Sequence, residues 1–280
     1  MAEEKSESRR TFLKRLGWGA AGLVAGTTAL DIAYERHWVE VTRPRIGIPG
    51  LPQAFEGFRI CHLTDIHHGP YLSLESVEEM VRLASALGPD AYVITGDLPH
   101  RHERYVAPAW HALAPLQALM GVWCVMGNHD WWHGIEAGRR AAREVGITCL
   151  DNRAVPLRRG GERLWLAGVG DLWEDEQHLG AALRPVPKGD PVILLTHNPD
   201  YADDMHDPRV KLMLAGHSHG GQVSPPLIGP IAVPCKRKYT RGLVKTEVSQ
   251  IYINRGLGMS TVPFRIGSRP EIALIELTRA

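Results

Sequence analysis

The chain has 280 residues, of which 44% are apolar, so it is long enough for one large domain or two small ones with a sizeable core. Its formal net charge of +1 gives no reason to expect a nucleic-acid partner. The four cysteines form no C-x-x-C pair, so we expect no disulfide framework, and Cys61 and Cys124, which lie in apolar runs, are expected to be buried free thiols.

The N-terminal segment has the pattern of an export signal. Residues 8–14 read Ser-Arg-Arg-Thr-Phe-Leu-Lys, and a weakly apolar, glycine-containing stretch follows at residues 16–30. This pattern resembles a twin-arginine signal. A basic amphipathic helix or a short membrane anchor is the alternative, although the stretch is shorter than the roughly 20 residues of a spanning helix. No clear Ala-x-Ala cleavage site follows, so an uncleaved anchor stays open.

These features predict three parts of the chain. Residues 1–40 are expected to be the signal or anchor, residues 41–56, with three prolines, to be a linker and lead-in strand, and residues 57–280 to be the folded domain. The domain is then expected in the periplasm or on the outer face of the cytoplasmic membrane, with the twin-arginine translocation machinery as a partner.

The folded domain alternates apolar runs with segments of helical periodicity. Helices are expected at residues 74–87, 106–119 and 135–145. Strands are expected at residues 58–63, 91–95, 121–126, 147–150, 155–157, 164–169, 192–195 and 212–215, followed by a mostly strand-like tail at 231–277. The first half therefore predicts an α/β fold with parallel pairing, and the strand-rich second half predicts a second sheet.

Polar loops follow five of the predicted strands. They read Asp65-Ile-His67, Gly96-Asp97, Gly127-Asn-His-Asp130, Thr196-His197 and Gly216-His-Ser-His219. Open α/β sheets bind ligands at the carboxyl ends of their strands, so we expect these loops to form one cleft, with their glycines allowing tight turns. Imidazole, carboxylate and amide ligands together suit manganese, iron or zinc.

In this order, the five loops resemble those of the calcineurin-like metallophosphoesterase superfamily, across nearly all of residues 58–280. The resemblance implies an α/β fold in which two sheets form a β-sandwich flanked by helices, in four αββα layers. It also implies two metal sites. Asp65, His67 and His219 would hold the first metal. The second would be held by Asn128, His197 and His217, with Asp97 bridging both metals.

The chemistry that the resemblance implies is hydrolysis of a phosphate ester by a metal-bridging hydroxide. Two divalent ions, of manganese, iron or zinc, can clamp a phosphate and lower the pKa of a bound water from about 15.7 towards 7. In-line attack on phosphorus then needs mainly positioning and charge neutralisation. Asp97, as the bridging ligand, is therefore expected to be essential for catalysis.

In this family the histidine at the position of His129 contacts the phosphate and protonates the leaving oxygen. Many members pair it with an aspartate three residues after the bridging aspartate, where this sequence has His100. The partner of His129 is therefore open between Asp130, Glu103 and His100 itself, and a solvent-facing His100 is an equal alternative.

Asn128 and Arg255 are further predicted substrate-binding residues, with Arg265 as an alternative phosphate contact. Arg255 belongs to the run Asn254-Arg-Gly-Leu-Gly258, which is similar to a subgroup of exported or membrane-associated bacterial phosphodiesterases. Asp171 is expected either to line the cleft or to cap a helix. The tryptophans that follow the Asn-His-Asp loop are expected to be packing residues or an apolar wall.

We expect a phosphodiesterase that acts on a cell-envelope or lipid phosphate ester, at or near a membrane surface. One alternative resembles UDP-2,3-diacylglucosamine hydrolase, which cleaves a pyrophosphate, but that substrate is made on the cytoplasmic side, away from an exported enzyme. The other alternative is a non-catalytic scaffold that binds partners. The presence of all seven predicted metal ligands argues against a scaffold.

Overall fold

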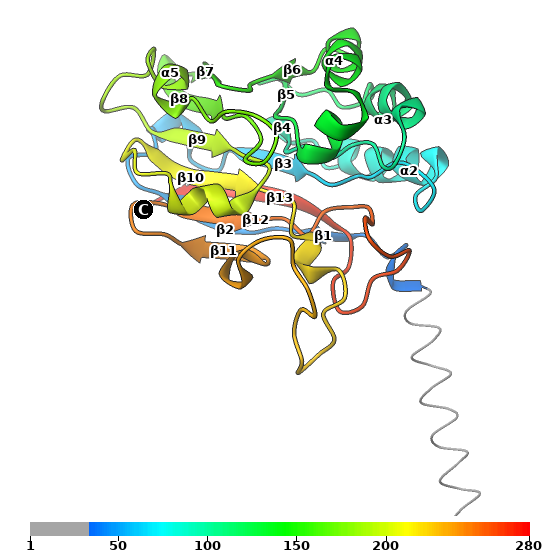
Figure 1. Cartoon of the computed structure of the whole chain (residues 1–280). Helices are drawn as coiled ribbons and strands as arrows, with labels where there is room; N and C mark the ends of the chain where they lie inside the picture. The colour runs from blue at the N-terminus through cyan, green and yellow to red at the C-terminus, as the bar shows by residue number, and fades with distance from the viewer. Residues whose placement is uncertain (1–33) are drawn as a thin grey trace, which may run out of the picture.

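The computed structural model describes residues 34–280, which form two β-sheets with helices on their outer faces (Figure 1). The predicted export signal at residues 8–14 and the apolar stretch at 16–30 lie outside the described residues. In the described part, no helix combines the length and apolar character needed to cross a bilayer.

The first sheet contains strands from both ends of the described chain. Its members are β1 (Glu40–Thr42), β2 (Arg45–Ile48), β3 (Arg59–Leu63), β4 (Ala91–Ile94), β5 (Val122–Cys124), β6 (Thr148–Cys149) and β13 (Glu271–Arg279). The strand order is β1-β13-β3-β4-β5-β6, and β2 also pairs with β13. Strands β3 to β6 run parallel, whereas β13 is antiparallel to β3.

The second sheet has the order β11-β12-β10-β9-β8-β7. These strands are β7 (Arg153–Arg159), β8 (Glu162–Gly168), β9 (Val192–Leu195), β10 (Val210–Ala215), β11 (Gly242–Lys245) and β12 (Gln250–Ile253). The four central strands run parallel, and only the two edge strands, β7 and β11, are antiparallel to their neighbours.

The core between the two sheets explains why the central strands read as continuous apolar runs. Successive side chains of a strand point to opposite faces. In β9, Ile193 and Leu195 therefore pack between the sheets, while Val192 and Leu194 pack into a separate core on the outer face. Ile60 in β3 likewise faces the second sheet, and its neighbour Cys61 faces the helices. Strands that are covered on both faces need apolar residues throughout.

The helices are α2 (Leu74–Ser85), α3 (Val106–His111), α4 (Asn128–Glu144) and α5 (Leu179–Ala182). Figure 1 shows α2, α3 and α4 grouped on the first sheet and α5 beside the second. Ser73 caps α2 by accepting from the Ser76 amide at 3.2 Å. The buried face of α2 includes Val77, Val81 and Ala84 at helical spacing. The predicted four-layer α/β arrangement is thus confirmed.

Two helix boundaries differ from the prediction. Helix α3 ends at His111 rather than at residue 119, because Pro115 lies in the segment that follows and supplies no amide to continue the helix. Helix α4 starts at Asn128 rather than at residue 135, because Asp130 caps it by accepting from the Gly127 amide at 2.9 Å. The helix is kinked at Gly134, where φ is 133°.

The prediction of a mostly strand-like tail was wrong. Between residues 231 and 277, strands are confined to β11, β12 and the first part of β13, and loops make up most of residues 254–270. Prolines and glycines recur along this stretch, and proline has no amide to donate to a strand ladder. Residues 41–56, expected to be a linker with a lead-in strand, hold most of β1 and all of β2, which both pair in parallel with β13.

The Glu271 carboxylate, at the start of β13, joins the two sheets. It accepts from the Thr42 hydroxyl of β1 and the Tyr252 hydroxyl of β12, each at 2.6 Å, and from the Arg255 Nε at 3.0 Å. Arg255 also donates to Glu40 at 2.9 Å. Burial raises the pKa of Glu271, but the charge of Arg255 and the two hydroxyls outweigh burial and hold the pKa below its usual value.

We predict that Glu271→Ala lowers the free energy of unfolding at pH 7 by about 3–5 kcal/mol, because it breaks the buried ion pair of Arg255 and leaves this arginine only the half-exposed Glu40. The folded-state pKa lies below the unfolded value of 4.5, so this stabilisation is complete above that value and is lost as the pH falls through the folded pKa. Urea titrations at pH 7 and pH 3 measure both effects.

The matched control for this prediction is Glu276→Ala. Glu276 lies on β13, as Glu271 does, and pairs with Arg45 of β2 at 3.0 Å. The side chains of Glu276 and Arg45 are 38% and 69% exposed. An exposed pair contributes less than about 1 kcal/mol. Equal destabilisation by the two substitutions would show that Glu271 does not join the sheets as described.

Candidate binuclear metal centre

Loops from both sheets meet at the carboxyl ends of β3, β4, β5, β9 and β10. Within the first sheet, the Asp65 amide donates to the Gly96 carbonyl at 3.0 Å. Between the sheets, the His217 amide donates to Asp65 Oδ2 at 2.8 Å, and His197 Nδ1 lies 2.6 Å from the Thr95 carbonyl. These contacts bring together the five polar loops that the sequence singled out.

Asp65, His67 and His219 form a first group of ligand atoms, and all three side chains are buried. His67 Nε2 and His219 Nε2 lie 3.0 Å apart, and His219 Nε2 lies 3.3 Å from Asp65 Oδ1. Ligand atoms bound to one ion at about 2.0–2.2 Å lie roughly 3–3.5 Å apart. The first group therefore has the spacing of ligands around a single metal ion.

Asp97, His197 and His217 form a second buried group. His197 Nε2 lies 3.0 Å from His217 Nδ1 and 3.2 Å from Asp97 Oδ2. The same Asp97 oxygen lies 3.5 Å from His67 Nε2 in the first group. One carboxylate oxygen thus stands between the two groups, in the position of a bridging ligand.

Two buried oxygens at the site have no hydrogen-bond partner among the described residues. They are Asp65 Oδ1 and Asn128 Oδ1, on side chains that are 0% and 2% exposed. A buried polar atom without a partner is costly and indicates that something outside the protein chain satisfies it. The Thr95 carbonyl accepts from His197 Nδ1, an orientation that leaves the Nε2 lone pair free for a ligand.

At His197, burial lowers the pKa, but the nearby Asp97 outweighs burial and raises the pKa well above its usual value. The pKa values of three other predicted ligands suit metal binding directly. Burial, followed by the charge of His197, lowers the pKa of His217 to about 3, and burial likewise lowers the pKa of His219. Burial raises the pKa of Asp97, but the charges of nearby histidines outweigh it and hold this pKa well below the usual value. Neutral imidazoles and ionised carboxylates are the forms that coordinate metals.

The backbone of the site is strained in a regular way. Asp65, His67, Asp97, His217 and His219 have φ values of 50°, 49°, 59°, 65° and 51°. This left-handed region is uncommon for residues other than glycine and costs about 1–3 kcal/mol for each residue. The sequence did not predict this strain at five of the candidate ligands. Backbone strain of this kind concentrates at functional sites.

Two glycines are needed because of close approach rather than turn conformation. A Cβ on Gly127 would meet Asp97 Oδ1 and the His197 ring, and a Cβ on Gly216 would meet the side chains of Thr64 and Asp65. Gly96 is needed for both reasons, since its φ of 90° supplies the tight turn that the sequence predicted and a Cβ there would meet the Gly127 backbone. Alanine at Gly127 or Gly216 would therefore push a predicted ligand out of position.

Comparison with known proteins decides the family. The family model described as calcineurin-like phosphoesterase matches residues 58–221. The chain belongs to this family.

Two relatives align with the phosphoesterase over almost its full length. The uncharacterised metallophosphoesterase YkuE of Bacillus subtilis is 34% identical over 98% of this chain and 98% of its own. Phosphodiesterase YaeI of Escherichia coli is 30% identical over 96% of this chain and 99% of its own. A solved 5'-nucleotidase precursor from Thermus thermophilus aligns with a TM-score of 0.47 at 13% identity, over 78% of this chain and 54% of that chain, a likeness too weak to carry an argument.

The chain is thus a metallophosphoesterase, and the cofactors of this family are two divalent metal ions. The described residues fit such cofactors on three observations. Two groups of ligand atoms have metal-like spacing, one Asp97 oxygen lies between them, and two buried oxygens have no other partner. Oxygen and imidazole ligands without thiolates agree with manganese, iron or zinc.

Asp130 is a structural residue of the phosphoesterase site. Its Oδ2 accepts from the amides of Asp97 at 2.7 Å and Gly127 at 2.9 Å, and its Oδ1 accepts from the Leu98 amide at 3.3 Å. Burial and the neighbouring Asp97 raise the pKa of Asp130 to about 7. Because both oxygens are occupied by backbone amides, Asp130 holds the Asp97 loop and is not the carboxylate partner of His129.

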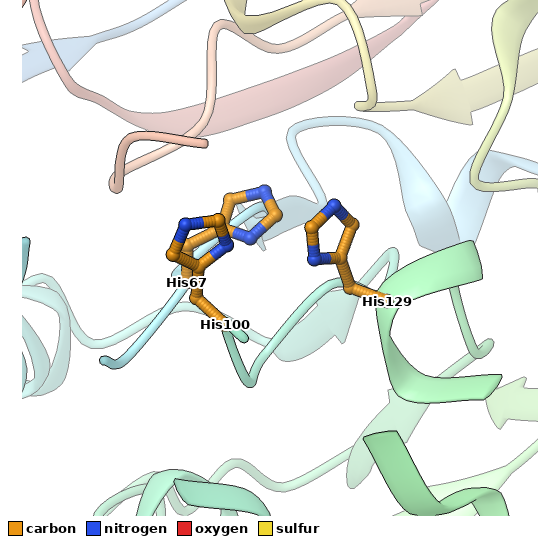
Figure 2. A group of neighbouring side chains, drawn as sticks. All are labelled: His67, His100 and His129. Atoms are coloured by element: carbon orange, nitrogen blue, oxygen red, sulfur yellow. The ribbon is translucent and has the colours of Figure 1, made fainter. Parts of the chain in front are cut away.

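His129 lies at the start of α4 among other aromatic rings, and no carboxylate of residues 34–280 hydrogen-bonds to its ring. Figure 2 shows its imidazole opposite those of His67 and His100, and the ring centroids lie 4.5 Å and 5.3 Å away. His100 stacks on His129 at an interplanar angle of 27° and is only 3% exposed, so the solvent-facing alternative for His100 was wrong. Burial lowers the pKa of His129 to about 4, although Asp97 opposes this.

The guanidinium groups of Arg255 and Arg265 hydrogen-bond to other parts of the protein beside the metal-ligand loops. The Arg255 guanidinium donates to Glu271 and Glu40, which disagrees with the expectation that it contacts a phosphate. Arg265 is fully buried and donates to the carbonyls of Gly258 and Ser268 at 3.0 Å and 2.9 Å. Arg265 also donates to the His219 carbonyl at 3.4 Å and therefore fixes the loop of this ligand. Glu40, the partner of Arg255, lies 215 residues earlier and could not be read from the sequence.

Half-exposed tryptophans flank the metal ligands on two sides. Trp132 is 51% exposed and lies 4.7 Å from the His129 ring, and Trp173 is 48% exposed and lies edge-on to His217 at 4.5 Å. Trp132 donates to Glu174 at 2.7 Å, which connects the two sides. Asp171 accepts from the Trp173 and Glu174 amides at 3.0 Å and 3.1 Å, so it closes a turn in this second loop, and the expectation that it caps a helix was wrong.

Proposed function

We propose that this phosphoesterase is a phosphodiesterase, with Asp65, His67 and His219 holding one metal ion, and with Asn128, His197 and His217 holding the other. The observation that carries the proposal is the Asp97 oxygen, 3.5 Å and 3.2 Å from a histidine nitrogen of each group. The name of the Escherichia coli relative, a phosphodiesterase at 30% identity, supports diester rather than monoester chemistry.

When bound, two divalent metal ions neutralise the charge of a phosphate ester and activate water. The protein residues supply position and proton transfer. The Asp97 Oδ1 accepts from the His129 amide at 2.8 Å, so the bridging carboxylate also fixes the start of α4, where His129 and Asn128 lie. His129 is then held beside the ligand groups with its ring partly accessible, as a donor to the leaving oxygen requires.

With Mn²⁺ present, we expect the purified protein to hydrolyse bis(p-nitrophenyl) phosphate faster than p-nitrophenyl phosphate. Asp97→Ala and His217→Ala should each abolish both activities, because each removes a ligand from a charged, buried cluster. The control is His206→Ala, which changes an exposed histidine and should leave turnover intact. Unchanged turnover in the Asp97 and His217 variants would refute the site assignment, and a preference for the monoester would refute diester specificity.

The role of His129 as proton donor predicts a dependence on the leaving group. His129→Asn should lower kcat by about 10²–10⁴-fold for an alkyl ester, whose leaving oxygen needs a proton, and by much less for a p-nitrophenyl ester. The nearby His133 lies 5.5 Å from His129 and serves as a matched control as His133→Asn. Equal losses for the two esters would show that His129 does not donate the proton.

We further propose that the enzyme acts outside the cytoplasm on a phosphodiester of the cell envelope. The paired Arg9 and Arg10, the Phe-Leu pair that follows and the apolar stretch at residues 16–30 support this location. An exported enzyme meets phospholipid and other envelope phosphodiesters, whereas nucleotide substrates of the cytoplasm are out of reach.

The export proposal predicts that replacing both arginines by lysine, as Arg9→Lys with Arg10→Lys, retains the protein in the cytoplasmic fraction. Arg15→Lys, six residues after Arg9, is the control and should not change the distribution. Fractionation of cells followed by immunodetection measures both variants. Export of the double variant at the wild-type level would contradict a twin-arginine route.

A further inference from the structure

An uncharged loop directly follows Gly216-His-Ser-His219, the last of the five polar loops. After His219-Gly-Gly-Gln222, residues 223–235 read Val-Ser-Pro-Pro-Leu-Ile-Gly-Pro-Ile-Ala-Val-Pro-Cys, without a charged side chain. We call residues 225–234 the apolar loop. Figure 1 shows this part of the chain, in yellow to orange between residue 222 and β11, projecting away from both sheets at the lower side of the view.

The apolar loop exposes large aliphatic side chains to solvent. Leu227 is 108% exposed, Ile228 is 73% exposed and Ile231 is 61% exposed. Burying such side chains is favourable, so a cluster of three exposed on one projection marks an interaction surface. Outside the loop, Leu119 is the one large aliphatic side chain of comparable exposure among the described residues, at 89%.

The projection has a defined shape at its base. The Gly229 amide donates to the Pro225 carbonyl at 3.0 Å, and the Ile231 amide donates to the Val223 carbonyl at 3.0 Å. Val223 also forms a β-bridge with Ile266, which ties the loop to the chain that carries Arg265. These bonds and four prolines hold Leu227, Ile228 and Ile231 outward, and no described part of the chain covers them.

A basic segment adjoins the apolar loop. Residues 236–241 read Lys-Arg-Lys-Tyr-Thr-Arg, and residues 223–241 contain no acidic residue. Lys236 and Lys238 pair with Asp203 at 2.6 Å and 2.7 Å, but Arg237 and Arg241 are exposed and form no ion pair with a described side chain. Cations beside an apolar tip are complementary to a surface that is anionic outside and apolar beneath.

Aromatic side chains near the same chain segments extend this pattern. Tyr34 and Trp38 are 64% and 51% exposed and contact each other at 5.9 Å, and Arg269 lies 4.0 Å from the Trp38 ring. Glu35 accepts from the Gly267 and Ser268 amides, so this aromatic pair is tied to the loop that bridges Val223. Tryptophan and tyrosine favour the boundary between lipid headgroups and acyl chains.

We propose that the apolar loop docks the phosphoesterase on an anionic lipid bilayer, with Leu227, Ile228 and Ile231 entering the acyl boundary and Arg237 and Arg241 contacting headgroups. Three aliphatic side chains are too few for a stable contact with a second copy, which needs about 1,200 Å² or more of buried surface. Because the apolar loop begins six residues after His219, docking brings the metal ligands close to headgroup phosphodiesters. The choice of lipid as substrate rests on the proposed function, whereas the docking does not.

The test is sedimentation of the full chain with vesicles of phosphatidylcholine and phosphatidylglycerol at 3:1, compared with phosphatidylcholine alone. The triple variant Leu227→Ser, Ile228→Ser, Ile231→Ser should partition at least about tenfold less onto the mixed vesicles than the wild type, since each serine removes an apolar side chain from the boundary. Leu119→Ser is the matched control, because Leu119 is 89% exposed but lies outside the loop. The N-terminal segment is the same in all three proteins.

The charge component has its own variant. Arg237→Gln with Arg241→Gln should remove most of the preference for the mixed vesicles and reduce the salt dependence of binding. Wild-type partitioning by the triple variant overturns the proposal, and so does equal loss in the Leu119 control. A change in the oligomeric state of the triple variant without a change in vesicle binding also overturns it, in favour of contact between copies.

Turnover of bis(p-nitrophenyl) phosphate in solution separates this proposal from the function. The triple variant should keep wild-type turnover of this soluble diester and lose activity only on diesters presented in vesicles. If the wild type fails to hydrolyse the soluble diester, the proposed function fails while the vesicle result stands. If the triple variant loses soluble turnover, the loop acts on the active site and the docking proposal is overturned.

Discussion

A single carboxylate oxygen organises the metal centre. Asp97 Oδ2 lies between His67, which follows a strand of the first sheet, and His197, which follows a strand of the second. The other oxygen of Asp97 accepts from the His129 amide and so fixes the start of α4. The two sheets and the first turn of this helix therefore converge on one side chain, and any shift of Asp97 would separate the two ligand groups and His129 at once.

The conformation of Asp97 is unfavourable by itself and is stabilised by the residues around it. The residue has a left-handed backbone, is buried, and carries a charge whose burial is unfavourable. Asp130 stabilises this arrangement by accepting from the Asp97 amide, and the absence of a side chain at Gly127 leaves room for the carboxylate. Strain and buried charge of this kind persist only where the surrounding structure determines the geometry, as the covered strands on either side do here.

The sequence could predict the parts of the site that depend on strand ends. Strands that are covered on both faces read as apolar runs. The polar residues that follow β3, β4, β5, β9 and β10 therefore indicated both where each strand ends and which side chains are candidate metal ligands. The helices and the tail were less predictable. Asn128, His129 and Asp130 look like a polar loop, yet they form the first turn of α4 because Asp130 caps it. The apolar residues of the tail resembled strands, but its prolines prevent continuous pairing.

The roles of charged residues around the site could not be predicted, because they depend on partners far away in the chain. Arginine is a residue type that commonly contacts phosphate, but the Arg255 guanidinium donates to Glu271 and to Glu40, which lies 215 residues earlier. Asp130 resembled a catalytic carboxylate until the backbone amides around it were placed. Tertiary contacts thus moved two candidate functional residues into the supporting structure, while the predicted metal ligands remained at the centre.

The account depends most directly on two metal ions sharing Asp97. Anomalous X-ray scattering from crystals of the enzyme grown with Mn²⁺ would locate the ions. We expect two peaks, one beside Asp65, His67 and His219 and the other beside Asn128, His197 and His217, both within bonding distance of the Asp97 carboxylate. A single peak, or two peaks that do not share Asp97, would contradict the account.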